Sequence, residues 1–231
     1  MIDYTQFAFI FDMDGTLVDN MRFHTRAWEM MLHENGIEAC AEDFLVNTAG
    51  KTNREIVPAI FPDAAPDEVL RLADRKEEIY RAIYLPERTP LAGAVAFLQE
   101  SRRLGISMAV ATAAPPLNVE FILDGLEIRH YFEAVTNSSE VLRGKPDPEI
   151  FLRTAEKLGK DPACCIVFED ALNGFQAASR AGMKSIGIAT VNSVGVILGQ
   201  PSVVGAFENF LGINPQDCVR NNILESAVSN F

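Results

Sequence analysis

The 231-residue sequence has little cysteine and few positive charges. Its cysteines show neither a C-x-x-C pair nor the spacing of a small disulfide scaffold, so we interpret them as buried apolar side chains: Cys40, Cys164, Cys165 and Cys218. With 20 Lys and Arg against 32 Asp and Glu, the net charge is -12. This charge repels a nucleic-acid backbone, so no nucleic-acid partner is expected and any phosphorylated ligand needs local cations.

Long apolar runs and a basic leader are also missing. The first ten residues contain no basic segment before an apolar stretch, and no window approaches about 18 uninterrupted apolar residues. We therefore expect a soluble, cytoplasmic protein that does not bind membranes, and we expect a monomer. Since 48% of the residues are hydrophobic, the chain can bury a full core.

Short apolar runs alternate with helical patterns along most of the chain. The alternation predicts an α/β fold, a doubly wound (Rossmann-like) parallel sheet with helices on both faces. The predicted strands are Phe7 to Phe11, Ile106 to Ala111, Ala134 to Thr136, Ala163 to Phe168 and Lys184 to Ile188. The predicted helices between them are Leu91 to Leu104, Leu117 to Leu126, Pro148 to Leu158 and Ala171 to Ala181. A further helix is predicted from Val203 to Phe210.

One insertion interrupts this alternation directly after the first strand. Residues 19–87 contain only helical patterns, among them Asn20 to Asn35, which Gly36 ends, and a helix from Pro66 to about Tyr84. We predict an all-helical cap over residues 19–87 and a catalytic core made of residues 1–18 and 88–231. Ligands of such sheets sit beyond the carboxyl ends of the strands, so the cap would lie over the ligand.

Two carboxylates follow the first strand in the run Asp12-Met13-Asp14-Gly15-Thr16. A carboxylate at a strand end can attack phosphorus, while a second one two residues on can move protons on the same ligand. The alternative is a polar turn.

Two phosphate-binding candidates stand at later strand ends. Thr112 and the backbone N–H groups from Ala113 onward precede a helix and form a candidate anion site, although a threonine that closes a strand is often structural. Lys145 lies between Gly144 and Pro146, which stiffens the segment, so it could present a fixed charge to phosphate. The alternative is an ordinary surface lysine.

An acidic pair, Glu169-Asp170, follows the strand that ends at Phe168. Carboxylates of this kind are typical ligands of Mg²⁺, which we predict as the cofactor. Asp170 could otherwise be only a helix N-cap. All these candidates follow successive strands, so one sheet edge brings them together, and the converging carboxylates then need a divalent cation. This combination predicts phosphoryl transfer to or from a small phosphorylated metabolite.

These motifs together resemble those of the haloacid dehalogenase superfamily, and within it the proteins similar to β-phosphoglucomutase with a cap after the first strand. The resemblance covers about residues 7 to 190 and rests on D-M-D-G-T at Asp12, on Thr112, on Lys145 in G-K-P-D-P and on E-D-A-L-N-G at Glu169. The resemblance implies that Asp12 is the nucleophile and Asp14 the acid and base. It also implies that Mg²⁺ is held by Asp12, the Asp14 carbonyl and Asp170, with help from Glu169, and that Thr112 and Lys145 bind the phosphoryl group.

Four cap residues are further candidates for substrate contacts. Lys76 lies in an apolar helical stripe, where a lysine snorkels, pairs or points into a cavity, and similar mutases place a cap lysine in the active site. His24 lies in H-T-R-A-W, close to a mutase motif whose histidine contacts the acid/base aspartate, although a histidine beside an aromatic is often packing. Lys51 and Arg54 follow Gly50 and could read the far part of the substrate or be solvated.

One departure from the mutases favours hydrolysis. Where the mutases have a serine and an asparagine that help clamp a second phosphate, this chain has Ala114, Pro115 and Pro116. We therefore predict a Mg²⁺-dependent phosphatase of small phosphate monoesters, with sugar phosphates as the expected substrates. The alternative is a β-phosphoglucomutase that interconverts glucose 1-phosphate and glucose 6-phosphate. A non-catalytic binding protein is a distant third interpretation.

Overall fold

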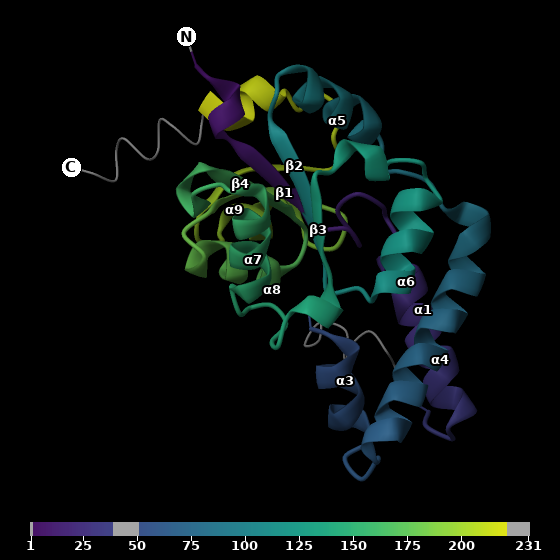
Figure 1. The fold of residues 1–231 in the computed structure, drawn as a ribbon. Coiled ribbons are helices and arrows are strands. Elements are labelled where there is room, and N and C mark those ends of the chain that lie inside the picture. The colour runs from purple at the N-terminus through teal and green to yellow at the C-terminus, as the bar shows by residue number, and fades with distance from the viewer. Residues whose placement is uncertain (1, 39–50, 221–231) are drawn as a thin grey trace.

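The core of the protein is a six-stranded sheet in which every neighbouring pair is parallel. The computed structural model describes residues 2–38 and 51–220. The strand order is β3-β2-β1-β4-β5-β6, which confirms the predicted α/β fold (Figure 1). The strands are β1 (Ala8–Phe11), β2 (Ser107–Ala111), β3 (Ala134–Thr136), β4 (Cys165–Glu169), β5 (Lys184–Ile188) and β6 (Val203–Phe207).

Successive side chains of a strand point to opposite faces of the sheet. In β1 all of them are buried, so both faces of the sheet are covered there. Phe9 and Phe11 of β1 join one hydrophobic cluster, in which Phe97 of α5 (Ala94–Arg103) stacks on Phe9 at 5.6 Å between ring centroids. Ala8 and Ile10 point to the other face. There they pack with residues of α7 (Glu149–Leu158) and α8 (Leu172–Arg180). Burial of each large side chain stabilises the fold by about 1.5–3 kcal/mol, so β1 is firmly held at the centre.

The remaining core helices are short. α6 (Pro116–Val119) begins at the second proline of the pair and runs directly into a π-helical turn, Glu120–Asp124. α9 (Val194–Leu198) begins at Ser193, whose hydroxyl accepts a hydrogen bond from the Val196 amide and so caps the helix.

In the described part of the predicted cap, residues 19–38 and 51–87, three α-helices lie together beyond the carboxyl ends of the strands (Figure 1). They are α1 (Met21–Glu34), α3 (Asn53–Ile60) and α4 (Pro66–Tyr84), and α1 packs along α4. Pro66 at the first position and Asp67 and Glu68 in the first turn suit the start of α4. A reciprocal capping box between Thr52 and Glu55 begins α3. The boundaries at residues 19 and 87 stay a prediction.

Two sequence predictions of secondary structure were wrong. Residues 203–207 form strand β6, which pairs with β5, and not the predicted helix. Val203 and Val204 favour extended backbone, and the open edge of β5 supplies the hydrogen-bond partners that decide the conformation. The strand predicted from Ala163 begins at Cys165, because Pro162–Cys164 forms a 3-10 turn capped by Asp161.

Cys165 and Cys218 are buried as predicted, Cys164 is half-buried, and Cys40 lies outside the described residues. Within residues 2–38 and 51–220, no helix combines the length and the apolar character needed to span a membrane. The cytoplasmic location and the monomeric state stay predictions.

Candidate active site

The ends of β1, β2 and β4 bring three of the predicted residues to one edge of the sheet. Asp12 directly follows β1, and its N–H donates to the Phe168 carbonyl at 2.9 Å. Thr112 follows β2, and its N–H donates to the Thr136 carbonyl at 3.0 Å. Glu169 is the last residue of β4. These hydrogen bonds continue the sheet ladder by one residue, so rigid backbone positions each functional side chain.

Lys145 connects two of the carboxylates. Its ammonium donates to Asp12 Oδ1 at 2.6 Å and to Glu169 Oε2 at 2.7 Å, and the lysine is only 2% exposed. The other oxygen of Glu169 accepts from the backbone amides of Asp170 and Ala171. Glu169 therefore fixes both the lysine and the start of the loop that leads into α8.

Two glycines make room for the acidic pair. Gly15 has φ of +81°, and a Cβ there would lie 2.2 Å from Asp170 Oδ2. A Cβ on Gly174 would lie 2.0 Å from the Glu169 carboxyl carbon. Asp170 itself accepts a hydrogen bond from the Thr16 hydroxyl at 3.1 Å. The glycines in D-M-D-G-T and E-D-A-L-N-G are thus required by the close approach of carboxylates to the backbone.

Crowding shifts the titration of these groups. Burial raises the pKa of the Asp12 carboxyl to about 8, and the Glu169 charge adds to the rise while Lys145 opposes it. Burial and the charges of Glu169 and Asp12 hold the pKa of Asp170 well above its usual range. Burial alone would lower the pKa of Lys145, but Asp12 and Glu169 raise it above its ordinary value. Negative charge is thus held here at a free-energy cost.

This donor set fits a hard divalent cation. Asp12, Glu169 and Asp170 each offer a carboxylate oxygen, and the three oxygens lie within 4.8 Å of one another. Mg²⁺ prefers such oxygen ligands, and its charge would relieve the repulsion that raises the two aspartate pKa values. Three of the four residues predicted to bind the metal thus lie close together, and the role of Asp14 as a ligand stays a prediction.

Thr112 follows β2, which lies on the other side of β1 from β4, and it lines the same pocket as the acidic pair. Its buried hydroxyl accepts a hydrogen bond from the Ala114 amide at 3.1 Å. Ala113 is half-buried and lines the same pocket. The Thr112 side chain thus holds the loop that presents the Ala113 backbone to the pocket.

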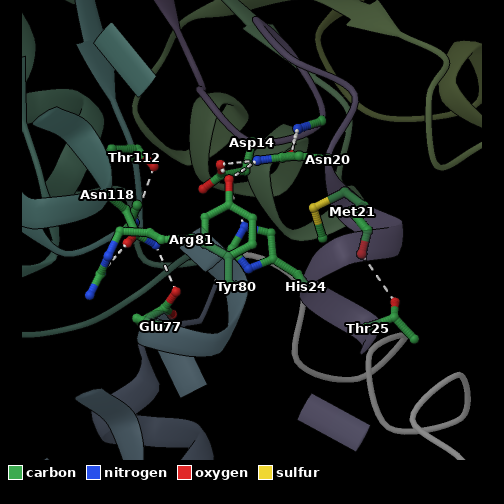
Figure 2. A network of polar contacts seen from close by, with 12 residues as sticks. Asp14, Asn20, Met21, His24, Thr25, Glu77, Tyr80, Arg81, Thr112 and Asn118 are labelled. Carbon is green, nitrogen blue, oxygen red and sulfur yellow. Dashed lines mark hydrogen bonds and ion pairs between the residues drawn. The ribbon is translucent and has the colours of Figure 1, made fainter. Parts of the chain in front are cut away.

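Asp14 is oriented by a residue that the sequence did not single out. Asn20 donates to Asp14 Oδ1 at 2.6 Å and to the Tyr80 hydroxyl at 2.6 Å, while its own Oδ1 accepts from the Gly15 amide (Figure 2). Asn20 is fully buried. The amide therefore fixes Asp14 against Tyr80, a residue of the cap.

His24 and Lys76 reach this site from the cap. Lys76 Nζ lies 2.7 Å from His24 Nδ1, and His24 stacks on Tyr80 at 3.8 Å. Because an ammonium can only donate, Nδ1 must be the acceptor and the imidazole proton belongs on Nε2. His24 Nε2 is 3.5 Å from Asp14 Oδ1, without hydrogen-bond geometry. The pair thus aims a donor at Asp14.

One pocket contains most of the predicted residues. Lys51 is exposed at its rim, whereas Arg54 is exposed and is not among the residues that line it. The lining residues are Asp12, Asp14, Met21, His24, Trp28, Lys51, Asn53, Ile56, Lys76, Glu77, Thr112, Ala113, Ala114, Asn118, Lys145, Glu169, Asp170 and Ala171.

Three residues that the structure places at the site were not predicted from the sequence: Asn20, Glu77 and Asn118. A signal for Glu77 was present, since it lies one helical turn after Ala73 and nearly one before Tyr80, on the buried face of α4. Asn118 follows the proline pair, where the predicted helix begins, but nothing local shows that a cap residue meets it.

Comparison with known proteins identifies the class. The chain matches the family of haloacid dehalogenase-like hydrolases over residues 8–182. It is 35% identical over 188 residues to the fructose-1-phosphate phosphatase YqaB of Escherichia coli strain K12, a match that covers 80% of this chain and 98% of that protein. It is 30% identical over 184 residues to a phosphorylated carbohydrates phosphatase of Thermotoga maritima, covering 78% of this chain and 83% of the relative.

A crystal structure of β-phosphoglucomutase from Clostridium difficile shares the fold, with a TM-score of 0.84 and 24% identity over 98% of this chain and 100% of that one. The protein thus belongs to the haloacid dehalogenase-like hydrolases. The predicted family is confirmed, and so is the predicted enzyme class, a phosphoric monoester hydrolase.

Proposed function

We propose that the protein is a Mg²⁺-dependent phosphatase of small phosphate monoesters, chiefly sugar phosphates, that forms an aspartyl-phosphate on Asp12. One observation carries this proposal: Asp12 directly follows the central strand, and its carboxylate lies beside Lys145 and the acidic pair in a pocket that cap residues also line. The similarity to two phosphatases of phosphorylated carbohydrates supports the substrate class.

Asp12, Asp170 and the Asp14 backbone carbonyl would hold Mg²⁺, with Glu169 close by. When bound, Mg²⁺ supplies positive charge that offsets the carboxylates and the phosphoryl oxygens. Lys145 adds a fixed ammonium beside the Asp12 carboxylate, and Thr112 with the Ala113 amide faces the same space. These groups can bind the phosphoryl oxygens and orient phosphorus toward Asp12.

Two steps complete the reaction. A carboxylate oxygen of Asp12 attacks phosphorus, the bond from phosphorus to the sugar oxygen breaks, and Asp14 donates a proton to that oxygen. Asp14 then accepts a proton from water as the water oxygen attacks the phosphorus of the aspartyl-phosphate. Inorganic phosphate leaves, and the Asp12 carboxylate is restored. Asn20 positions Asp14 for both transfers through its hydrogen bond, and His24 Nε2 lies 3.5 Å from the same carboxylate oxygen.

We propose that residues 19–87 act as a cap that excludes water from the first step. His24, Lys76 and Lys51 would face the substrate from this side, since all three line the pocket. Arg54 would contact substrate only if α3 moved closer to the core.

Hydrolysis is favoured over mutase activity by the residues that follow Thr112. Ala113, Ala114, Pro115 and Pro116 offer no side-chain donor for a second phosphate. The next side-chain amide along the chain, that of Asn118, is already hydrogen-bonded to Glu77 and Arg81. Few groups after Thr112 could therefore hold the second phosphate of a bisphosphate intermediate.

A phosphate-release assay tests the proposal. The protein with Mg²⁺ is given sugar phosphates, nucleotides and pyrophosphate, and we expect the fastest release from a sugar monophosphate. Isomerisation of β-glucose 1-phosphate that depends on a bisphosphate primer would show a mutase instead. If no compound of the panel is turned over, the protein would instead be interpreted as a non-catalytic binding protein.

A further inference from the structure

A buried carboxylate of the cap is not used by the chemistry proposed above. Glu77 of α4 is 4% exposed and lines the pocket. Its Oε1 accepts from Lys76 Nζ at 2.9 Å and from Asn53 Nδ2 at 2.7 Å. Its Oε2 accepts from Asn118 Nδ2 at 2.7 Å (Figure 2). Three donors from three helices thus converge on one carboxylate.

The carboxylate stays ionised. Burial would raise the pKa of Glu77, but the charge of the adjacent Lys76 and the hydrogen bonds from Asn53 and Lys76 lower it to about 2. Glu77 is therefore a permanent anion at any pH at which the protein would act.

The neighbouring polar groups are committed to this anion. The Lys76 ammonium contacts both Glu77 and His24, so the positive charge of Lys76 is paired with the Glu77 carboxylate. Asn118 donates to Glu77 and accepts from Arg81 Nη1 at 2.7 Å, so both ends of its amide are occupied. Lys145, by contrast, pairs its ammonium with Asp12, the residue that would attack phosphorus. The Lys145 ammonium, and Mg²⁺ when bound, would thus face the phosphoryl group, whereas the ammonium beside Glu77 is already shared with Glu77 and His24.

We propose that Glu77 is a specificity-determining residue that excludes a second phosphate, so that substrates are monophosphates whose far end carries hydroxyl groups. This inference rests on the proposed function. A hydroxyl can donate a hydrogen bond to a carboxylate, whereas a phosphate oxygen offers only lone pairs and negative charge. A second phosphate beside Glu77 would place like charges together, and such repulsion discriminates against the wrong substrate.

The test compares fructose 1-phosphate with fructose 1,6-bisphosphate, which differ only in the far phosphate. The measured quantity is kcat/KM for phosphate release with Mg²⁺, expressed as the ratio of bisphosphate to monophosphate for each variant. We expect the unaltered protein to favour the monophosphate by about tenfold or more, and Glu77→Gln to raise the ratio by about tenfold or more.

Two controls separate charge from structure. Asn118→Ala breaks the contact with Glu77 but keeps the charge, so its ratio should stay close to that of the unaltered protein. Glu77→Gln combined with Asn118→Asp keeps the hydrogen bonds and moves the negative charge across to residue 118. This double variant should restore the preference for the monophosphate.

The outcomes distinguish the inference from the proposed function. If the unaltered protein releases phosphate from the monophosphate but Glu77→Gln leaves the ratio unchanged, Glu77 does not select by charge. The same conclusion follows if Asn118→Ala raises the ratio as much as Glu77→Gln, since loosening of the cap would then explain both. Absence of release from any sugar phosphate would instead overturn the proposed function, and the inference with it.

Discussion

At the scale of the residue, the main feature of the site is the close spacing of its negatively charged carboxylates. Asp12, Glu169 and Asp170 place carboxylate oxygens within 4.8 Å of one another, and all three residues are buried. Lys145 offsets part of this charge through Asp12 and Glu169. The raised pKa values of Asp12 and Asp170 show that the protein alone does not balance the rest.

The nucleophile can be tested by one nearly isosteric change. In Asp12→Asn an amide oxygen can still accept from Lys145, but no carboxylate remains to attack phosphorus. We expect kcat to fall by more than about a thousandfold. The melting temperature without metal should be unchanged or higher, because one crowded charge is removed. Phosphate release and thermal unfolding are the measurements.

Asp63→Asn is the matched control, because Asp63 is exposed and far along the chain from every strand end. It should leave both quantities unchanged. Survival of more than about a thousandth of the activity in Asp12→Asn would argue against covalent catalysis.

At the scale of the element, the start of α8 is shaped by the need to accommodate Glu169. Gly174 lies in the first turn of this helix, and a Cβ there would overlap the Glu169 carboxyl group that holds Lys145. The helix can pack against the sheet only because this position lacks a side chain. A residue that normally weakens a helix is therefore part of the site's architecture.

Gly174→Ala should displace Glu169 and, through it, Lys145. We expect a loss of about 1–3 kcal/mol in the free energy of unfolding and at least about a tenfold fall in kcat/KM. Chemical denaturation and the phosphate-release assay measure these two effects.

Gly195→Ala provides the comparison within another helix, α9, where an added Cβ meets no atom within 4 Å. That variant should keep its activity and gain up to about 1 kcal/mol of stability from the better helix propensity of alanine. Equal behaviour of the two variants would show that the close approach to Glu169 has no functional role.

At the scale of the whole molecule, the candidate metal site joins segments that are far apart in the chain. Asp12 follows β1, while Glu169 and Asp170 lie at the end of β4, the strand beside it in the sheet. A cation bound between them would stabilise the folded chain alone, because the unfolded chain does not hold these oxygens together.

Mg²⁺ should therefore raise the melting temperature as well as support turnover. At a hundredfold excess over Kd, the expected gain is about 2.7 kcal/mol, which corresponds to about 5 to 10 °C for a chain of this size. Asp170→Asn should remove most of this gain. Differential scanning calorimetry with Mg²⁺ and with EDTA measures it, and identical curves would contradict a magnesium site.

The sequence by itself determined the sheet, the strand-end positions of Asp12, Thr112 and Glu169, and the family. It could do so because apolar strands and the polar residues that end them are local patterns, and parallel strands present their carboxyl ends at one edge. Residues 203–207 escaped prediction because a free sheet edge decided their conformation.

Only the tertiary structure decided which residues meet across the pocket. Asn118 and Glu77 are 41 residues apart, and Asn20 and Tyr80 are 60 apart, yet each pair is hydrogen-bonded. No local pattern encodes such contacts, because they depend on how the helices of residues 19–87 dock against the sheet. The residues that would surround the phosphoryl group could therefore be predicted from motifs. The presence of Glu77 in the same pocket could not, because it depends on how the helices pack.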